Sequence, residues 1–251
     1  LGTPMFAFFT RFISISTFSL LLSFTGSVYG SPDQLRFSVL KTAESSGSSE
    51  AMVVEGGDFF KLRQLVHTAV LVQHPKGDFL WDTGIGREIE KQMSVFSFLE
   101  AQLFSIENVN PAAQQLTKEG YDIGGLMAII PSHMHWDHAS GIEDFPGVPV
   151  WIQKNALAEA KVGKAPGFLR SQYDSDAIDW SLIELTKASY RGFEKSLDIY
   201  GDGSAVLVDL SGHTHGQLGL FLNNVAEGQT YFFIGDTTWA LKGVVDNKPR
   251  P

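Results

Sequence analysis

The sequence predicts a mixed α/β fold, and three observations support this prediction. Short apolar runs typical of buried strands, such as 126–130 and 205–210, alternate with stretches of helical periodicity. The chain has 251 residues, of which 43% are hydrophobic and 19% charged, so it can bury one sizeable core. Three of the expected strands end next to histidine or aspartate residues, which is where open α/β sheets carry their chemistry.

The first thirty residues differ in composition from the rest of the chain. Arg11 is the only charged residue in 1–30, and an apolar run is followed there by small residues. This order is typical of a secretory signal peptide, and we predict cleavage after Gly30, with an uncleaved membrane anchor as the alternative. We therefore expect a periplasmic or secreted protein with one domain over 31–251, whose only membrane contact is this leading segment.

The next elements are expected to be strands followed by a long helix. Apolar runs and turn residues predict strand 35–40, a polar loop at 44–50, a strand at 65–73 and a hairpin that returns through 79–81. The spacing of Ile89, Met93 and Phe96 continues a helical period over 87–116.

The second part of the chain alternates strands with other elements. We expect strands at 126–130, 148–153, 205–210, 218–223 and 231–234, a helix over 155–161 and a mixed insertion at 163–201. Asn155 is the expected cap of that helix. Because strands deliver polar residues at their ends in both halves, the pattern favours a pseudo-duplicated α/β architecture.

Composition narrows the chemistry. The formal net charge is −9 and no run of Lys or Arg occurs, which argues against a nucleic-acid partner and favours a small-molecule substrate. Cysteine is absent, so disulfides, thiolate metal sites and a cysteine nucleophile are excluded. Any metal would have to be held by histidine and carboxylate side chains.

The densest chemical signal is a six-residue segment that contains His133, His135, Asp137 and His138. Three imidazoles this close together repel one another when they are protonated, and a bound cation removes that conflict. Mixed histidine and carboxylate donors suit zinc first, with iron and manganese as alternatives. The segment therefore predicts a metal site on a loop at the end of a strand.

Three further motifs accompany this segment in order along the chain. They are Asp82-Thr83-Gly84, Gly212-His213-Thr214-His215-Gly216 and Gly235-Asp236. Together with the His-x-His-x-Asp-His segment they resemble the signatures of the metallo-β-lactamase superfamily, nearest its lactonase-like secreted or periplasmic members. The resemblance covers most of residues 35–240. It implies the family's four-layer αββα sandwich, with the C-terminal end truncated in this chain.

The resemblance also implies a site for two zinc ions per full-length subunit. His133, His135 and His213 would hold one metal, Asp137 and His138 would hold the second, and Asp236 would bridge both. It implies hydrolysis by a metal-activated hydroxide, which zinc makes available near neutral pH, with Asp137 and Asp236 as the catalytic carboxylates.

Two residues are expected to support the ligands by hydrogen bonding. Asp82 would fix a ligand imidazole, with a plain turn-stabilising role as the alternative. His215 stands where the family has proline, and we interpret it as a residue of the turn or as a hydrogen-bonding partner of a ligand. We assign ordinary structural roles to His67 and His74.

Two departures from the family's pattern bear on the chemistry. Dinuclear members take one more histidine from further downstream, and none follows His215 here, which we attribute to truncation. Lactonases of the family carry a tyrosine where this chain has Trp239, and an indole offers only one N–H donor. Tyr173, Tyr190 and Tyr200 are the candidates to replace that tyrosine.

These expectations lead to a metal-dependent hydrolase that opens a lactone, cyclic ester or related acyl bond. We expect Trp239, Trp136, Phe96 and Phe104 to line an apolar substrate pocket, and the phenylalanines are numerous enough to form a homodimer face instead. The alternatives are a metallo-β-lactamase, an iron-dependent oxidoreductase similar to persulfide dioxygenases, and a non-catalytic, metal-stabilised binding protein.

Overall fold

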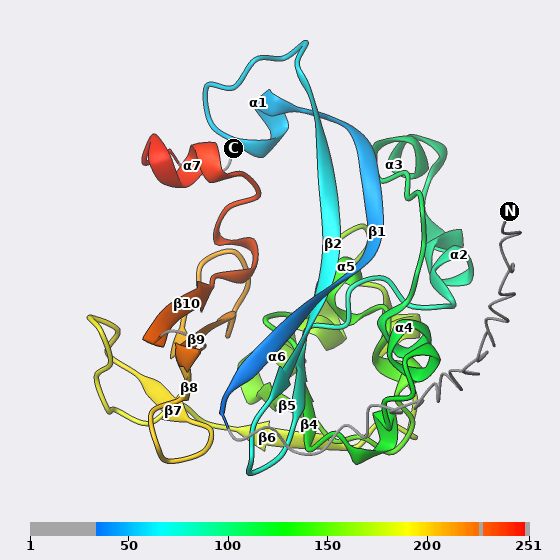
Figure 1. The fold of residues 1–251 in the computed structure, drawn as a ribbon. Helices are drawn as coiled ribbons and strands as arrows, with labels where there is room; N and C mark the ends of the chain where they lie inside the picture. Colours follow the sequence, from blue (N-terminus) through cyan, green and yellow to red (C-terminus); the bar gives the residue numbers. More distant parts are fainter. Residues whose placement is uncertain (1–33, 226–227, 249–251) are drawn as a thin grey trace, which may run out of the picture. The chain divides into compact units, whose positions relative to one another are not determined.

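The computed structural model describes residues 34–225 and 228–248, and these residues fold into two sheets flanked by helices (Figure 1). The predicted signal segment at 1–30 lies outside the described residues. In the part of the chain that is described, no helix is long and apolar enough to cross a membrane.

A six-stranded sheet is built from the first part of the chain, and its strands follow one another in chain order. The strands are β1 (Arg36–Ser49), β2 (Leu62–Gln73), β3 (Phe79–Trp81), β4 (Ala128–Ile130), β5 (Val150–Gln153) and β6 (Trp180–Ile183). The pairs β1–β2 and β2–β3 are antiparallel, whereas β3 to β6 pair in parallel. The carboxyl ends of the parallel strands therefore lie at one edge of the sheet.

A four-stranded sheet follows, with the order β10-β9-β8-β7 and antiparallel pairing throughout. Its strands are β7 (Ser196–Asp198), β8 (Ala205–Asp209), β9 (Leu218–Val225) and β10 (Gln229–Phe233).

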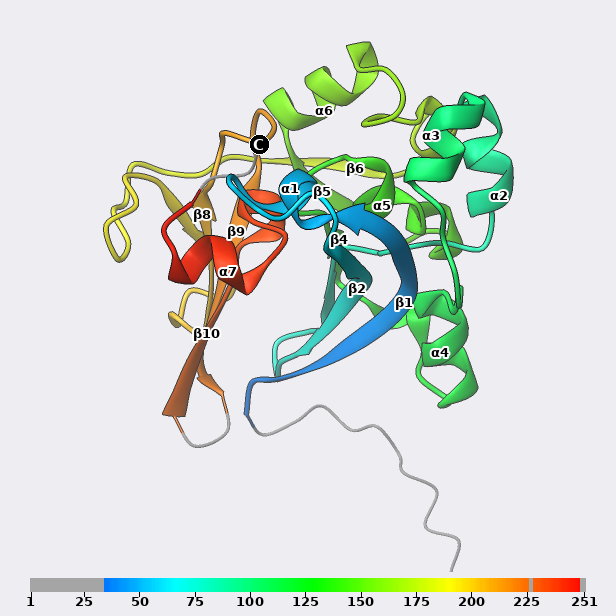
Figure 2. The ribbon, with the colours of Figure 1, turned by 90° about the horizontal axis from the view of Figure 1, so that it is seen from above.

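The helices are short, and most of them connect successive strands of the first sheet along the chain. They are α1 (Glu50–Val53), α2 (Ile89–Gln92), α3 (Phe98–Leu103), α4 (Ala112–Lys118), α5 (Trp136–Ala139), α6 (Lys154–Val162) and α7 (Leu241–Val245). Single 3-10 turns occur at η1 (Met93–Val95), η2 (Ile123–Gly125), η3 (Ile142–Asp144), η4 (Arg170–Gln172) and η6 (Gly235–Thr237). Seen from above, β1 is strongly curved and lies between β2 and α4 (Figure 2).

The alternation of side chains in β2 explains how the layers stack. Ala69 and Leu71 belong to one buried cluster, which includes residues of α4 and α6, while Val70 and Val72 belong to a second cluster with residues of β8 and β9. Successive side chains of a strand point to opposite faces, so one face of the sheet packs on helices and the other on the second sheet. The expected sandwich is confirmed.

The outer face of the second sheet has its own apolar cluster. Val206, Val208 and Phe221 pack there against Tyr190 and Phe193 from the segment between β6 and β7. Part of the predicted insertion at 163–201 therefore covers this sheet.

Three local predictions were wrong. Residues 44–49 belong to β1 and pair with β2, with register irregularities that let the polar stretch stay in the sheet. The expected helix over 87–116 is interrupted, because Ser97 and Glu100 form a capping box that starts α3, and Pro111 precedes α4. The N-cap of α6 is Gln153, and Asn155 lies inside the helix.

Candidate metal centre

Loops at the ends of strands from both sheets bring the candidate ligands together. His133 follows β4 after two residues, and Asp137 and His138 lie on α5 directly behind it. His213 follows β8 on a turn, and Asp236 follows β10 in η6. The sandwich therefore joins residues that are about a hundred positions apart in the sequence, as the four motifs predicted.

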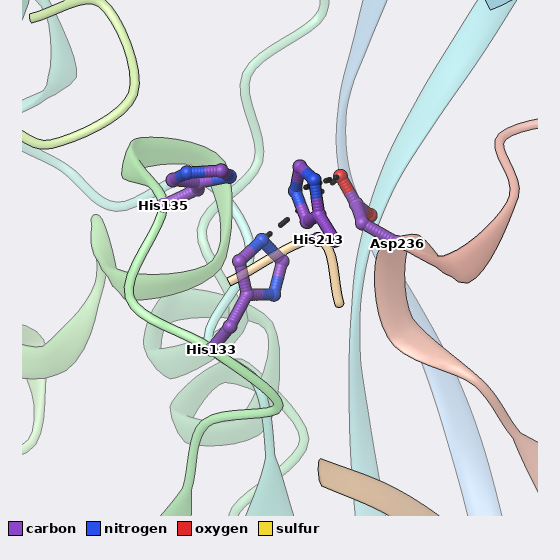
Figure 3. Close-up of side chains that lie close together, drawn as sticks. All are labelled: His133, His135, His213 and Asp236. Atoms are coloured by element: carbon purple, nitrogen blue, oxygen red, sulfur yellow. Dashed lines mark ion pairs between the residues drawn. The ribbon is translucent and has the colours of Figure 1, made fainter. Parts of the chain in front are cut away.

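The first donor group consists of His133, His135, His213 and Asp236 (Figure 3). Each residue offers one ligand atom, and these atoms all lie within 4.8 Å of one another. Asp236 Oδ2 is 3.5 Å from His213 Nε2 and 4.0 Å from His133 Nε2. A common ion could sit within roughly 2–3 Å of every donor, close to the bond lengths of zinc.

The second donor group consists of Asp137, His138 and Asp236, again with all donor atoms within 4.8 Å. His138 Nε2 lies 3.1 Å from Asp236 Oδ1 and 3.6 Å from Asp137 Oδ2. The two oxygens of Asp236 thus face different donor groups. One carboxylate is in a position to bridge two metal ions.

Asp82 and Ser132 orient two of these imidazoles from behind. Asp82 accepts hydrogen bonds from the backbone N–H of Ser132 at 2.6 Å and from its hydroxyl at 3.0 Å. The Ser132 oxygen is then an acceptor for His133 Nδ1 at 3.0 Å, and Asp82 Oδ2 lies 3.0 Å from His138 Nδ1. With the proton held on Nδ1, the Nε2 lone pair of each ring is directed at the donor groups, as in carboxylate–histidine–metal arrangements.

The electrostatics of the cluster favour a cation. Burial opposes protonation of His138, but the carboxylates of Asp82, Asp137 and Asp236 outweigh it and hold the His138 pKa well above its ordinary value. Burial acts against ionisation of Asp137 as well, yet His138 and His67 lower the Asp137 pKa. A site that attracts a proton this strongly also attracts a metal ion, which competes with that proton.

His135 behaves differently from His138. Burial and the nearby His213 outweigh the carboxylates of Asp137 and Asp236 and lower the pKa of His135 to about 4. Its ring is therefore neutral near pH 7, which is the form that binds a metal. The donor set, its tautomers and its charge all fit the two-metal site that the motifs implied.

His67 also contacts the site, although we expected an ordinary structural role for it. It is buried in β2, its Nδ1 lies 3.2 Å from Asp137 Oδ2, and its Nε2 lies 2.7 Å from Ser45 Oγ. The signal that could have found it is the register of β1 and β2, which places position 67 opposite Ala43. Because 44–50 was expected to be a loop, this register was not available from the sequence.

A cavity of about 840 Å³ opens over the donor groups. His135, Asp137, His138, His213 and Asp236 line its polar part. Its apolar walls include Trp136, Phe104, Leu103, Met52, Phe232 and Trp239. Drug-sized ligands occupy cavities of this volume, with a few polar groups at one end.

Three of the four predicted pocket residues line this cavity. Phe96 is not among the lining residues. It packs on Trp136 and Phe104, whose ring centroids lie 6.0 and 5.9 Å from its own. Trp239 donates its indole N–H to Asp236 Oδ2 at 2.6 Å, a contact that the interpretation of this residue as an apolar wall did not include.

The remaining candidates lie elsewhere. Tyr173 donates to the carbonyl of Ala160 and Tyr200 to that of Gly77, and no tyrosine is among the described residues that line the cavity. The side chain of His215 is exposed, and its backbone N–H donates to Glu159 at 2.8 Å. The structure thus brings Asp82, but not His215, to the ligands.

Comparison with known proteins places this geometry in a family. The model of the "Metallo-beta-lactamase superfamily" matches residues 62–249. The chain is 22% identical over 157 residues to N-acyl homoserine lactonase AttM of Rhizobium radiobacter, which covers 61% of this chain and 57% of that protein. It is 26% identical over 165 residues to gamma-lactamase MBL2 of Gibberella moniliformis, covering 62% and 68%.

A solved structure shares the fold. It is that of an AiiA mutant from B. thuringiensis with N-decanoyl-L-homoserine bound at the active site. The superposition gives a TM-score of 0.69 at 19% identity and covers 85% of this chain and 80% of the other. The sequence match to AttM spans little more than half of that lactonase's length.

Proposed function

The chain belongs to the metallo-beta-lactamase superfamily, and from this premise we propose that it is a two-zinc hydrolase that opens lactones carrying an apolar substituent. The observation that carries the proposal is the pair of donor groups joined by Asp236 at the base of an apolar cavity of about 840 Å³. Relatives named N-acyl homoserine lactonases support the substrate class. The described residues supply the polar and apolar surfaces that such a substrate needs.

Zinc at the two groups would activate water and polarise the scissile carbonyl, so that no nucleophilic side chain is required. Iron or manganese could use the same donors.

The residues of this chain have separate tasks in that reaction. His133, His135 and His213 would hold the first ion, and Asp137 and His138 would hold the second. Asp236 would contribute to both, since its oxygens face different groups. Asp137 would also accept a hydrogen bond from the attacking water and so orient it. The apolar walls around Trp136 and Phe104 exclude water and bind the substituent of the lactone.

The test is a paired measurement on the purified full-length subunit. Metal content per subunit is determined by elemental analysis, and ring opening is followed for N-acyl homoserine lactones of short and long acyl chain. We expect about two zinc ions per full-length subunit and turnover that is lost on chelation and restored by zinc. One iron per chain with no ring opening would support an oxidoreductase instead. If chelation lowers the stability of the protein and no hydrolytic activity is found, a metal-stabilised binding protein would be supported.

A lactam substrate is the second candidate, because one relative of this chain is named a gamma-lactamase. The same centre can attack an amide, but the amide nitrogen must be protonated as it leaves. The substrate panel therefore includes a γ-lactam and a β-lactam beside the lactone. Faster turnover of either lactam would replace the lactone assignment.

We further propose that the protein works outside the cytosol, as the composition of residues 1–30 indicates. N-terminal sequencing of the mature protein tests this. A mature chain that starts near Ser31 supports a cleaved signal, and retention of residues 1–30 contradicts cleavage.

A further inference from the structure

Ser45, His67 and Asp137 form a hydrogen-bonded row that leads from β1 through β2 to the second donor group. Ser45 Oγ lies 2.7 Å from His67 Nε2, and His67 Nδ1 lies 3.2 Å from Asp137 Oδ2. All three residues line the cavity. We propose that His67 is a positioning residue that fixes the Asp137 carboxylate for the second metal, and that Ser45 sets the tautomer of His67. This inference rests on the two-metal centre proposed above.

The geometry assigns a direction to each hydrogen bond. A carboxylate only accepts, so the nitrogen facing Asp137 must carry a proton. In a neutral imidazole the other nitrogen is then an acceptor, and the Ser45 hydroxyl is the donor that it needs. Each group of the row thus has one consistent role.

The row stands on rigid elements. His67 is buried in a strand that pairs with β1 and β3, and its ring packs 5.6 Å from the ring of Trp136, which belongs to the same short helix as Asp137. By contrast, the Asp137 side chain is 20% exposed toward the cavity. Without a fixed donor, this carboxylate could rotate away from His138. A partner that orients a carboxylate ligand typically raises metal affinity.

Asp82 and His67 therefore act on different members of the second group. Asp82 lies 3.0 Å from His138 Nδ1, whereas His67 contacts Asp137. The second group is held from two sides, by one residue of the loop after β3 and by one residue of β2.

The experiment compares variants that differ in where they place a donor. His67→Asn keeps an N–H donor close to the position of Nδ1, whereas His67→Gln places its amide close to Nε2 and His67→Leu has no donor. Zinc is titrated into each metal-free protein against a chromophoric chelator, which gives two dissociation constants. The cobalt(II) absorption spectrum reports the geometry of the second ion, and thermal unfolding verifies that each variant folds.

We expect the Leu and Gln variants to bind the second zinc about 10- to 100-fold more weakly, with the first constant unchanged. The Asn variant should recover most of the loss, and Ser45→Ala should show a smaller loss of the same kind. His74→Leu removes another buried histidine, remote from the cavity lining, and should leave both constants as in wild type.

The outcomes separate the two proposals. If wild type binds two zinc ions and the Leu variant binds them equally well, the positioning role of His67 is overturned. Equal losses in the Asn and Leu variants would also overturn it, because the position of the donor would then not matter. If the full-length wild type binds fewer than two zinc ions, the two-metal centre itself fails, and the role of His67 fails with it.

Discussion

Trp239 donates its indole N–H to Asp236 Oδ2 at 2.6 Å, so a wall of the cavity also holds the carboxylate that faces both donor groups. Trp239 is 37% exposed and is one of the residues that line the cavity. One side chain therefore shapes the pocket and positions a candidate metal ligand.

Replacing Trp239 should uncouple these two roles. Trp239→Phe keeps an aromatic wall but removes the donor to Asp236, and we expect zinc binding and turnover to fall by about 10-fold. Trp239→Tyr retains a donor in the form of a hydroxyl, so its turnover of lactones should exceed that of the Phe variant. Zinc titration and steady-state kinetics of both proteins measure this. Equal values for the two variants would contradict a role for the hydrogen bond.

Removing one imidazole from the first donor group should remove its metal. We expect His135→Ala to lose about one zinc ion per chain together with hydrolysis, because three remaining donors hold the ion less well. Elemental analysis after dialysis measures the loss. His215→Ala is the comparison, since that side chain is exposed and should change neither quantity. Unaltered zinc in the His135 variant would refute the ligand assignment.

Gly84 should be sensitive to any side chain. Its φ of +59° is in the left-handed region, and an added Cβ would overlap the side chain of Thr42. Gly120 also has a positive φ, of +77°, but a Cβ there meets no atom within 4 Å. We expect Gly84→Ala to lower the free energy of unfolding by about 1–3 kcal/mol more than Gly120→Ala. Urea denaturation measures both, and equal losses would show that the contact with Thr42 is unimportant.

The stability of the protein should depend on the protonation of His74. This buried ring stacks on Tyr200 with centroids 3.8 Å apart, and the backbone N–H of Lys76 donates to its Nδ1 at 3.1 Å. Burial lowers the His74 pKa, and the hydrogen bond from Lys76 requires Nδ1 to be unprotonated. The folded state therefore binds a proton less readily than the unfolded chain, whose histidine pKa is about 6.5.

It follows that stability is lost as the pH falls below about 6.5, by at most about 1.4 kcal/mol per pH unit from this residue. Urea unfolding at about pH 8 and about pH 5 measures the change. His74→Phe keeps a stacked ring that does not titrate, so its stability should fall less over the same interval. A slope identical to that of wild type would assign the effect to other groups.

The sequence predicted those parts of the site that are encoded locally. Ligands at strand ends, such as His133 and Asp236, follow apolar runs that identify the strands, and the packing of the two sheets then brings the strand ends together. His67 and Ser45 could not be found in this way. Their contact depends on pairing between β1 and β2, and the serine-rich stretch that pairs there has the composition of a loop.

The hydrogen bond of Trp239 was unpredictable for a related reason. The sequence gives the spacing of three residues between Asp236 and Trp239, but the direction of the indole depends on the turn that follows η6. The interrupted helices between 87 and 116 depended on local signals that were present in the sequence. There the capping residue Ser97 and Pro111 interrupt the helix that the apolar period alone predicts.

The distribution of the ligands along the chain has a consequence for biosynthesis. Asp236, which contributes to both donor groups, is translated about a hundred residues after His133, and it follows β10, an edge strand of the second sheet. Contacts between such distant segments form late in folding. The histidine segment is therefore synthesised well before Asp236, and a metal site that includes Asp236 would be complete only after synthesis of β10.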